Sequence, residues 1–178
     1  VIFGEDKIKE WAASIDWSNA AFVAHNAAMF DALIAAWRLK IKPKRWACTL
    51  AMARPHFNRG VGGSLAALAK YYELEAKGSL EGTNTKGKHL KDFTPLEIEQ
   101  MRIYNKLDTK LCFQIFRRLL PITSKREMEI MDMTIRMATE PQFMLDDELL
   151  ERTLKEEQQR KRESVLEAMM QIDPTAYL

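Results

Sequence analysis

The chain divides into short apolar runs and helical patterns that are separated by polar breaks. Residues 21–24, Ala-Phe-Val-Ala, form an apolar run that ends at His25-Asn26, which predicts a buried strand stopping at this polar pair. In residues 27–40 the large apolar side chains recur at helical spacing, which predicts a helix that ends before Pro43. Residues 46–52 fit either a second short strand or the start of a helix, because periodicity alone does not separate the two.

Two further helices are marked by the residues at their ends. Ser64 follows a glycine-rich turn and predicts the N-cap of a helix, with Gly78 beyond the end of that helix. A polar loop with several lysines is expected over residues 77–91. Residues 94–97, Thr-Pro-Leu-Glu, have the pattern of a capping box with proline at the first helical position. A long helix is therefore expected from there to residue 119 or 120, where a proline follows.

The character of the chain changes after Pro121. A methionine-rich helix is expected over residues 124–138, followed by a break at Glu140-Pro141 and a long charged helix over residues 146–171. Most of the last helix is polar all round, which is typical of a helix that bridges solvent or packs on another element. The change of character places a domain boundary near residue 122. The predicted domains are residues 1–122 and residues 123–178.

Composition is that of an ordinary globular chain. Of its 178 residues, 47% are hydrophobic and 29% are charged, which argues against wholesale disorder. No apolar run approaches the roughly 18 residues needed to span a bilayer, and the first residues do not resemble a signal peptide. We therefore expect no membrane association and a cytoplasmic location.

The chain does not begin with Met, which favours a piece of a larger protein. Cys48 and Cys112 are expected to be reduced, packed thiols.

Charge is distributed unevenly, although the net charge is only +2. Residues 38–59 carry seven bases and no acids, and residues 86–126 carry ten bases and four acids. From residue 127 to the end the balance reverses to six bases and thirteen acids. Two basic blocks suit a surface that follows a phosphate backbone, and they suit an ordinary solvated face equally well.

Tyr104 and Asp108 are four residues apart in the long helix, so they project from the same face. Leu111 and Ile115 continue that face as an apolar stripe, which places a carboxylate where the helix is expected to pack on a sheet. A buried carboxylate needs a cation, a dense set of hydrogen bonds or a raised pKa. The spacing leaves two interpretations open, a structural role and a metal or acid-base site.

A second polar group follows the predicted strand of residues 21–24. His25 and Asn26 stand at the end of that strand, and Asp31 comes about a turn and a half into the next helix. Small alanines share the side of the helix that carries Asp31, which leaves room for a ligand to approach. The alternative is structural, with Asn26 as a helix cap and Asp31 as an exposed acid near the helix start.

Taken together, these two motifs resemble those of a known enzyme family. A strand ending in His25-Asn26, a helix carrying Phe30-Asp31 and a later helix carrying Tyr104 and Asp108 resemble the second and third motifs of DEDD 3′→5′ exonucleases in the tyrosine subclass. The sequence between the motifs is similar to the exonuclease region of phage-type family A DNA polymerases. The resemblance covers about residues 19–120. It implies an α/β, ribonuclease H-like exonuclease fold without its first strands, followed by a mostly helical start of the polymerase region.

The resemblance also implies a mechanism and a set of site residues. In that family four carboxylates bind two divalent ions, Mg²⁺ or Mn²⁺, that activate a water and stabilise the leaving 3′ oxygen. Asp31 and Asp108 correspond to two of these catalytic, metal-binding carboxylates, and Tyr104 corresponds to the residue that orients the water. Asn26, Phe30 and His25 would lie near the terminal nucleotide. The implied partners are DNA, as a single-stranded 3′ end or a primer-template, and the remainder of the polymerase chain.

The sequence departs from the family pattern in two places. Asn26 is one residue further from Phe30 than is usual in the second motif. The Asp-x-Glu of the first motif has no counterpart before the strand, and the only such triplet, residues 146–148, is interpreted as first-turn acids of the last helix. This chain alone is therefore expected to be a weak or inactive nuclease. A stand-alone 3′→5′ exonuclease, or an exonuclease fold that has lost catalysis and serves as a nucleic-acid-binding scaffold, remains an alternative.

Overall fold

The computed structural model describes residues 2–80, 86–141 and 143–172, and in them the chain forms an α/β structure. The chain divides into two compact units, Val1–Pro141 and Gln142–Leu178. The α-helices and β-strands of the described residues are α1 (Glu5–Ala13), β1 (Ala21–Ala24), α2 (Asp31–Leu33), β2 (Arg45–Cys48), α3 (Thr49–Phe57), α4 (Leu65–Tyr71), α5 (Pro95–Leu119), α6 (Lys125–Thr139) and α7 (Asp147–Ile172).

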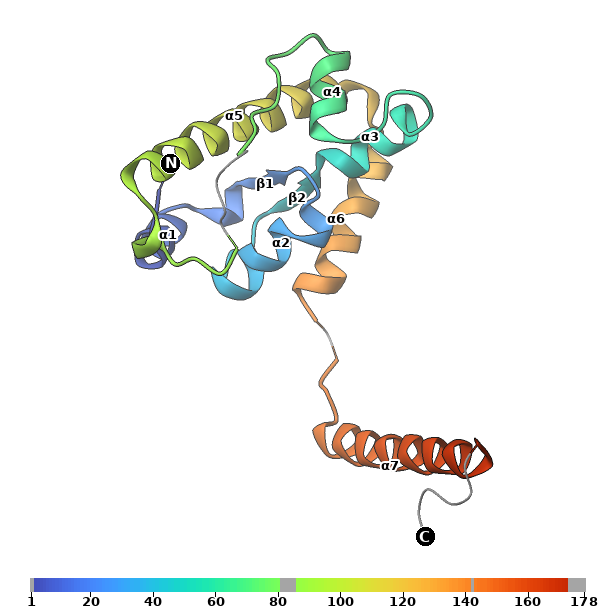
Figure 1. Ribbon diagram of the computed structural model, residues 1–178. Helices are drawn as coiled ribbons and strands as arrows, with labels where there is room; N and C mark the ends of the chain where they lie inside the picture. The colour runs from blue at the N-terminus through green and yellow to red at the C-terminus, as the bar shows by residue number, and fades with distance from the viewer. Residues whose placement is uncertain (1, 81–85, 142, 173–178) are drawn as a thin grey trace. The chain divides into compact units, whose positions relative to one another are not determined.

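The centre of the first unit is a parallel pair of strands between layers of helices. β1 pairs with β2 in a register that sets Ala21 opposite Arg45 and Ala24 opposite Cys48. α5 packs on β1, whereas α6 packs on β2 and also contacts α2, so the strands lie between α5 on one side and α2 and α6 on the other (Figure 1). Helices on both faces explain why Trp46, Ala47 and Cys48 of β2 are almost fully buried.

The strand expected at residues 21–24 is confirmed as β1, but its expected burial is wrong, because Ala21 is exposed and the other three residues are only partly buried. Residues 46–52 were compatible with a strand or with the start of a helix, and the structure contains both. β2 ends at Cys48 and α3 begins at Thr49. The prediction of a single continuous helix over residues 27–40 is wrong, because the segment is divided into three short helical pieces. The chain forms a 3₁₀ turn at Ala27–Met29, the short α2, and a π-helical turn at Ile34–Arg38. Phe30 interrupts the helix, since its φ of −145° lies outside the helical region.

α4 ends earlier than the position of Gly78 suggests. Glu73 takes a left-handed conformation with φ of 54°, and the Leu74 N–H donates to the Ala69 carbonyl at 2.9 Å. The Glu73 N–H donates to the Lys70 carbonyl at 3.2 Å. These two bonds make a Schellman motif in which glutamate holds the position usually taken by glycine. The helix therefore stops at Tyr71, and the following segment starts directly from this motif.

The capping box predicted at residues 94–97 is confirmed. The Glu97 N–H donates to Thr94 Oγ1 at 3.2 Å, and the Thr94 N–H donates to Glu97 Oε2 at 2.8 Å. α5 then runs to Leu119, in agreement with the expected end before the proline. α6 begins with a second capping box, formed by Ser124 and Glu127. These two helices are thus delimited by local hydrogen bonds that the sequence specifies directly.

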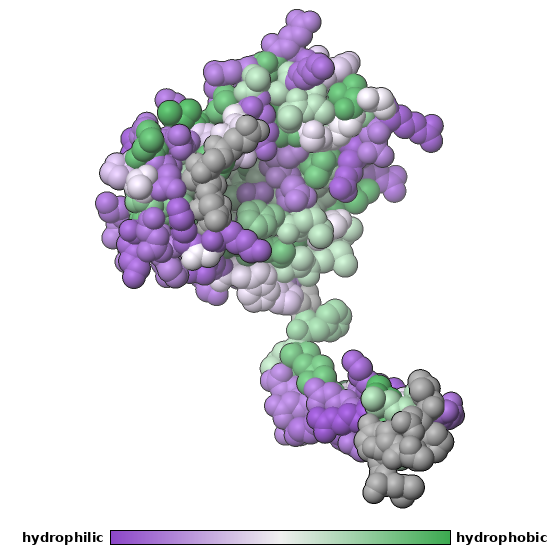
Figure 2. Space-filling model, in the orientation of Figure 1, coloured by the Kyte–Doolittle hydropathy of each residue, from purple (hydrophilic) through white to green (hydrophobic). Residues whose placement is uncertain are grey.

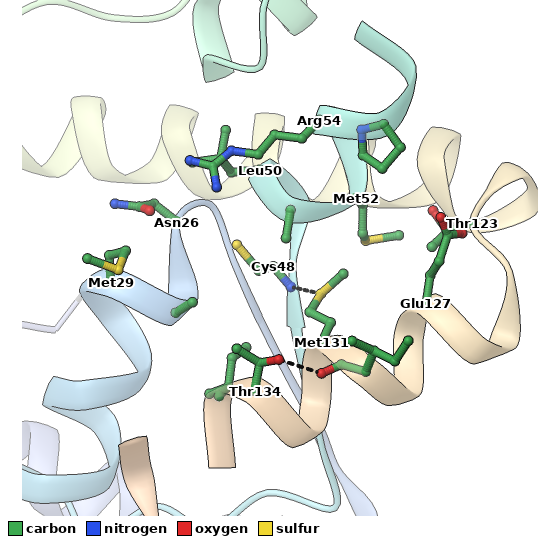
Figure 3. Close-up of a pocket in the computed structure, with 15 residues that line it drawn as sticks. Asn26, Met29, Cys48, Leu50, Met52, Arg54, Thr123, Glu127, Met131 and Thr134 are labelled. Atoms are coloured by element: carbon green, nitrogen blue, oxygen red, sulfur yellow. Dashed lines mark hydrogen bonds between the residues drawn. The ribbon is translucent and has the colours of Figure 1, made fainter. Parts of the chain in front are cut away.

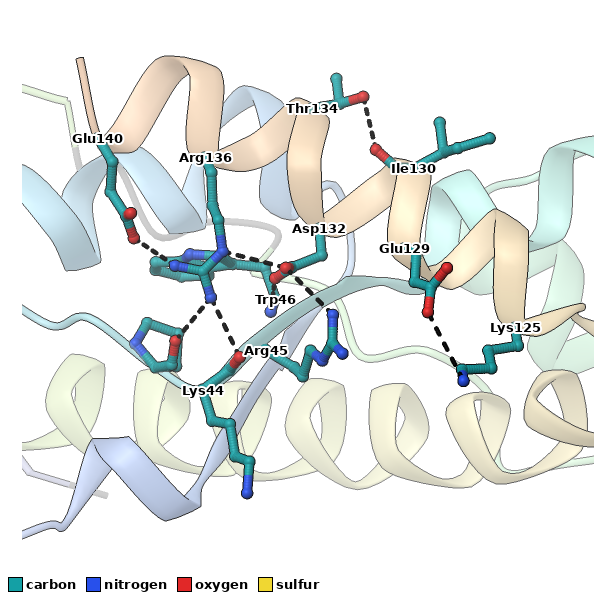
Figure 4. A network of polar contacts seen from close by, with 11 residues as sticks. Lys44, Arg45, Trp46, Lys125, Glu129, Ile130, Asp132, Thr134, Arg136 and Glu140 are labelled. Atoms are coloured by element: carbon teal, nitrogen blue, oxygen red, sulfur yellow. Dashed lines mark hydrogen bonds and ion pairs between the residues drawn. The ribbon is translucent and has the colours of Figure 1, made fainter. Parts of the chain in front are cut away.

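α6 belongs to the first compact unit, which continues to Pro141, whereas the boundary suggested by the sequence lies near residue 122. Asp132 is buried and accepts a hydrogen bond from the Trp46 N–H of β2 at 2.7 Å. Arg136 pairs with Asp132 and donates to the Pro43 and Lys44 carbonyls at 3.0 and 3.1 Å (Figure 4). This network binds α6 to β2 and to the segment that leads into it.

The second unit contains α7. Asp146 Oδ1 accepts a hydrogen bond from the Leu149 N–H at 2.9 Å, and Asp147 and Glu148 stand in the first turn. The sequence interpretation of residues 146–148 as acids of a helix N-terminus agrees with this geometry. No helix among the described residues combines the length and the apolar character that a bilayer crossing requires.

Candidate functional site

The candidate site is built where β1 and β2 end. His25 follows β1 and Thr49 follows β2, so the parallel register brings both residues to the same edge of the sheet. His25 Nδ1 lies 2.9 Å from Thr49 Oγ1, within hydrogen-bonding distance. The carboxyl ends of parallel strands are where open α/β sheets bind ligands. Thr49 was not expected from the sequence, because a buried threonine at a strand-to-helix junction carries no pattern of its own.

α5 crosses this edge and adds Asp108 and Cys112, which are one helical turn apart. Thr49 Oγ1 lies 3.8 Å from Cys112 Sγ. Burial raises the pKa of the Cys112 thiol, and the negative charges of Asp31 and Asp108 raise it further. The raised pKa keeps this thiol protonated near neutrality.

Asp31 is the first residue of α2 and is half-buried. Burial raises the pKa of its carboxyl group. Among the described residues Asp31 has no ion-pair partner. Its neighbour Phe30 is 60% exposed, so the ring is available at the surface instead of filling the core.

Asp108 has one paired oxygen and one unpaired oxygen. Lys77 Nζ lies 3.6 Å from Asp108 Oδ2 and 5.6 Å from the centroid of the Tyr104 ring. Asp108 Oδ1 is buried without a hydrogen-bond partner among the described residues. Hydrogen bonding to Tyr104 is the main influence that raises the pKa of Lys77, and the charge of Asp108 adds to it. Lys77 was missed by sequence reasoning, since it lies in a loop without periodicity.

His25 faces the same group of charges. Burial lowers the pKa of its imidazole, the positive charge of Lys77 lowers it further, and Asp108 acts in the opposite direction. The imidazole is therefore neutral near pH 7, so one ring nitrogen accepts a hydrogen bond and the other donates one. His25 thus lies near the pair of Lys77 and Asp108.

Asn26 faces a different part of the molecule. It has a left-handed backbone with φ of 73°, and its side chain makes no capping hydrogen bond, so the alternative in which the Asn26 side chain caps the helix is wrong. Instead Asn26 lines a cavity of about 430 Å³ together with side chains of α3 and α6 (Figure 3). Most of that lining is apolar, and Cys48 N–H donates to Met131 Sδ at 3.0 Å on its wall.

The surface of the first unit mixes hydrophilic and hydrophobic side chains, and a hollow opens in the middle of the face that Figure 2 presents. The exposed apolar side chains on this unit include Met29 and Phe30, which adjoin Asp31 in sequence. Aromatic and apolar side chains next to a carboxylate suit a ligand that combines a flat ring with charged oxygens.

The oxygen ligands at the carboxyl ends of β1 and β2 are suited in part to binding a divalent cation. Two carboxylates are hard oxygen ligands of the kind Mg²⁺ prefers, and the unpaired Asp108 Oδ1 is a buried acceptor without a donor. Groups of three or more histidine, cysteine, aspartate or glutamate residues able to hold a metal do not occur in the part of the chain that the structure describes. Asp31 and Asp108 therefore supply an incomplete set of ligands.

Comparisons with known proteins add no relative to this picture. No family model, no curated protein and no solved structure matches the chain.

Proposed function

We propose that this chain is the 3′→5′ proofreading exonuclease part of a DNA-directed DNA polymerase. The observation that carries the proposal is the buried Oδ1 of Asp108, unpartnered among the described residues, on the helix α5, which reaches the carboxyl ends of β1 and β2 through the contact of Cys112 Sγ with Thr49 Oγ1 at 3.8 Å. The two aspartates come from separate motifs, and their order and spacing resemble those of the DEDD exonucleases. A common metal-dependent site would require the two carboxylates to lie close together.

The proposed reaction is hydrolysis of the 3′-terminal phosphodiester. A water oxygen forms a bond to phosphorus, the bond from phosphorus to the 3′ oxygen breaks, and a nucleoside 5′-monophosphate is released. Two divalent ions, Mg²⁺ or Mn²⁺, would supply activation of the water and stabilisation of the leaving oxygen. Asp31 and Asp108 would hold them with further ligands. Tyr104, one turn before Asp108, would orient the water with its phenol hydroxyl.

Other residues of the site suit the binding of a frayed DNA end. Phe30 is exposed beside Asp31, where its ring would stack on a base. The neutral His25 would donate or accept a hydrogen bond without adding charge. The basic residues 38–59 and 86–126 would attract the phosphate backbone, so binding of single-stranded DNA should weaken as salt rises. A ribonuclease H-like arrangement of the helices around β1 and β2 is part of the same proposal.

The test measures release of a labelled 3′ nucleotide from a mismatched primer by the parent polymerase, alongside extension of a matched primer. Asp108→Asn removes one charge without changing the size of the side chain. We expect it to lower excision by about a hundred-fold or more, because loss of a metal ligand costs several kcal/mol of transition-state stabilisation. Extension should stay near wild type. Tyr104→Phe should reduce excision less, since it removes one hydrogen bond.

Glu99→Gln is the matched control, because Glu99 lies on the same helix and its side chain is 57% exposed. It should leave both activities unchanged. Normal excision by Asp108→Asn would refute the proposed role of this carboxylate. Equal loss of excision and extension would indicate unfolding and not a separate nuclease site. DNA binding without any excision in the wild-type parent would favour the nucleic-acid-binding scaffold.

A further inference from the structure

Residues 74–80, which we call the strap, follow α5 in the antiparallel direction. Glu75 Oε2 pairs with Lys110 at 2.6 Å, and Lys77 Nζ reaches Asp108 Oδ2 at 3.6 Å. Leu80 and the preceding two residues line a small pocket of about 170 Å³ with Gln100, Ile103, Tyr104 and Leu107. The contacts thus move toward the start of α5 as the strap proceeds. They span the two turns of the helix that carry Tyr104 and Asp108.

Gly78 allows the strap to lie directly on these turns. A Cβ atom at this position would come within 3.3 Å of Tyr104 Cδ2 and 3.5 Å of Leu107 Cδ2. The backbone next to Lys77 is therefore packed against the Tyr104 ring more closely than most side chains would permit. This packing fixes where the Lys77 side chain begins, and its ammonium group then lies over the ring and beside the carboxylate.

The ammonium group of Lys77 lies beside Asp108 Oδ2, one of the two carboxylate oxygens to which a metal ion would bind. Its side chain is 33% exposed and that of Asp108 is 24% exposed, so water screens this pair only in part. A positive charge this close to a carboxylate competes with any other cation for the same oxygen. The two cannot occupy the position together without strong repulsion. The strap itself is held partly by the exposed pair of Glu75 and Lys110, which costs little to break.

We propose that Lys77 is a resident cation of the site, which neutralises Asp108 when no divalent ion is bound and is displaced when one binds. This inference rests on the proposed function, because it takes Asp108 as a metal ligand. Lys77 would then lower the affinity of the first ion and limit metal binding in the absence of DNA. Once displaced, its ammonium would remain near the site, within reach of a DNA phosphate that enters with the metal.

The test measures Mn²⁺ binding to the full 178-residue chain by electron paramagnetic resonance of the free ion. A positive charge beside a carboxylate opposes the binding of another cation there, so we expect Lys77→Met to tighten Mn²⁺ binding about ten-fold. Lys77→Arg keeps the charge and should bind Mn²⁺ as the wild type does. Lys110→Met is the matched control, because it also removes one lysine charge, in this case from the neighbouring contact between α5 and Glu75 of the strap. It should have no effect on Mn²⁺ binding.

A second measurement examines the pair without metal. In EDTA, Lys77→Met should lower the thermal midpoint of the wild type but have a smaller effect in an Asp108→Asn background, because these changes remove the same interaction. Equal effects in the two backgrounds would overturn the proposed pairing.

The outcomes separate this inference from the proposed function. Tighter Mn²⁺ binding by Lys77→Met that disappears in the double variant with Asp108→Asn supports a resident cation. Unchanged or weaker binding by Lys77→Met, with binding that still depends on Asp108, overturns the resident cation and leaves the metal site standing. Absence of Mn²⁺ binding in the wild type and in Lys77→Met overturns the resident cation, whereas the proposed function is decided by the excision assay of Asp108→Asn in the parent polymerase.

Discussion

Asp132 is the residue whose loss should most weaken the attachment of α6 to the sheet. Its carboxylate is 9% exposed, accepts the Trp46 N–H at 2.7 Å and pairs with Arg136 Nε at 3.0 Å. Asp132→Ala would leave the Trp46 N–H buried without an acceptor. It would also remove one of the acidic partners of Arg136, which keeps Glu140 and two backbone carbonyls.

The expected cost follows from these contacts. A buried donor left without a partner costs about 1–3 kcal/mol, and the lost charged hydrogen bond adds to this. We expect Asp132→Ala to lower the free energy of unfolding by about 3 kcal/mol, with a matching fall of about 6–12 °C in the thermal midpoint. Asp132→Asn should cost less, since an amide oxygen still accepts the Trp46 N–H.

Tryptophan fluorescence is the appropriate assay. All four tryptophans, Trp11, Trp17, Trp37 and Trp46, lie in the first compact unit, so urea unfolding followed by this signal reports on that unit alone. Glu129→Ala is the control on the same helix, because Glu129 is 50% exposed and its pair with Lys125 spans 3.9 Å. It should change stability by less than about 1 kcal/mol. An equal, small effect of Asp132→Ala would refute the view that Asp132 joins α6 to β2.

Two further predictions concern local elements of the first unit. Glu73→Gly should stabilise the chain by about 1 kcal/mol, because glycine adopts the left-handed conformation after α4 without the penalty that a Cβ atom imposes, and urea unfolding would measure the gain. No gain would mean that Glu73 makes a compensating contact. The second prediction concerns pH. Hydrogen bonds from Thr94, together with Lys88, lower the pKa of Glu97 from 4.5 to about 2. The stability that this carboxylate contributes is present above pH 4.5 and is lost as pH falls toward 2, so thermal melts between these values should be less pH-dependent in Glu97→Gln than in the wild type. Parallel pH profiles of the two proteins would contradict this.

Several elements could be predicted from the sequence because short-range contacts define them. The capping box of Thr94 and Glu97 needs only residues three apart, and the start of α5 follows from it. The apolar run of residues 21–24 indicated β1. Tyr104 and Asp108 were expected on one helical face, because residues four apart in a helix project from the same side.

Other features depended on contacts between distant parts of the chain. Asp132 looks like an ordinary helical acid until β2 places the Trp46 N–H against it, which is why the first unit extends beyond residue 122 to Pro141. Lys77 looks like a loop lysine until Gly78 packs on Tyr104 and brings the ammonium group to Asp108. A sequence pattern reports the period of a helix or strand, but a buried hydrogen bond or ion pair forms only when folding removes water from both partners, and the tertiary structure decides which partners meet.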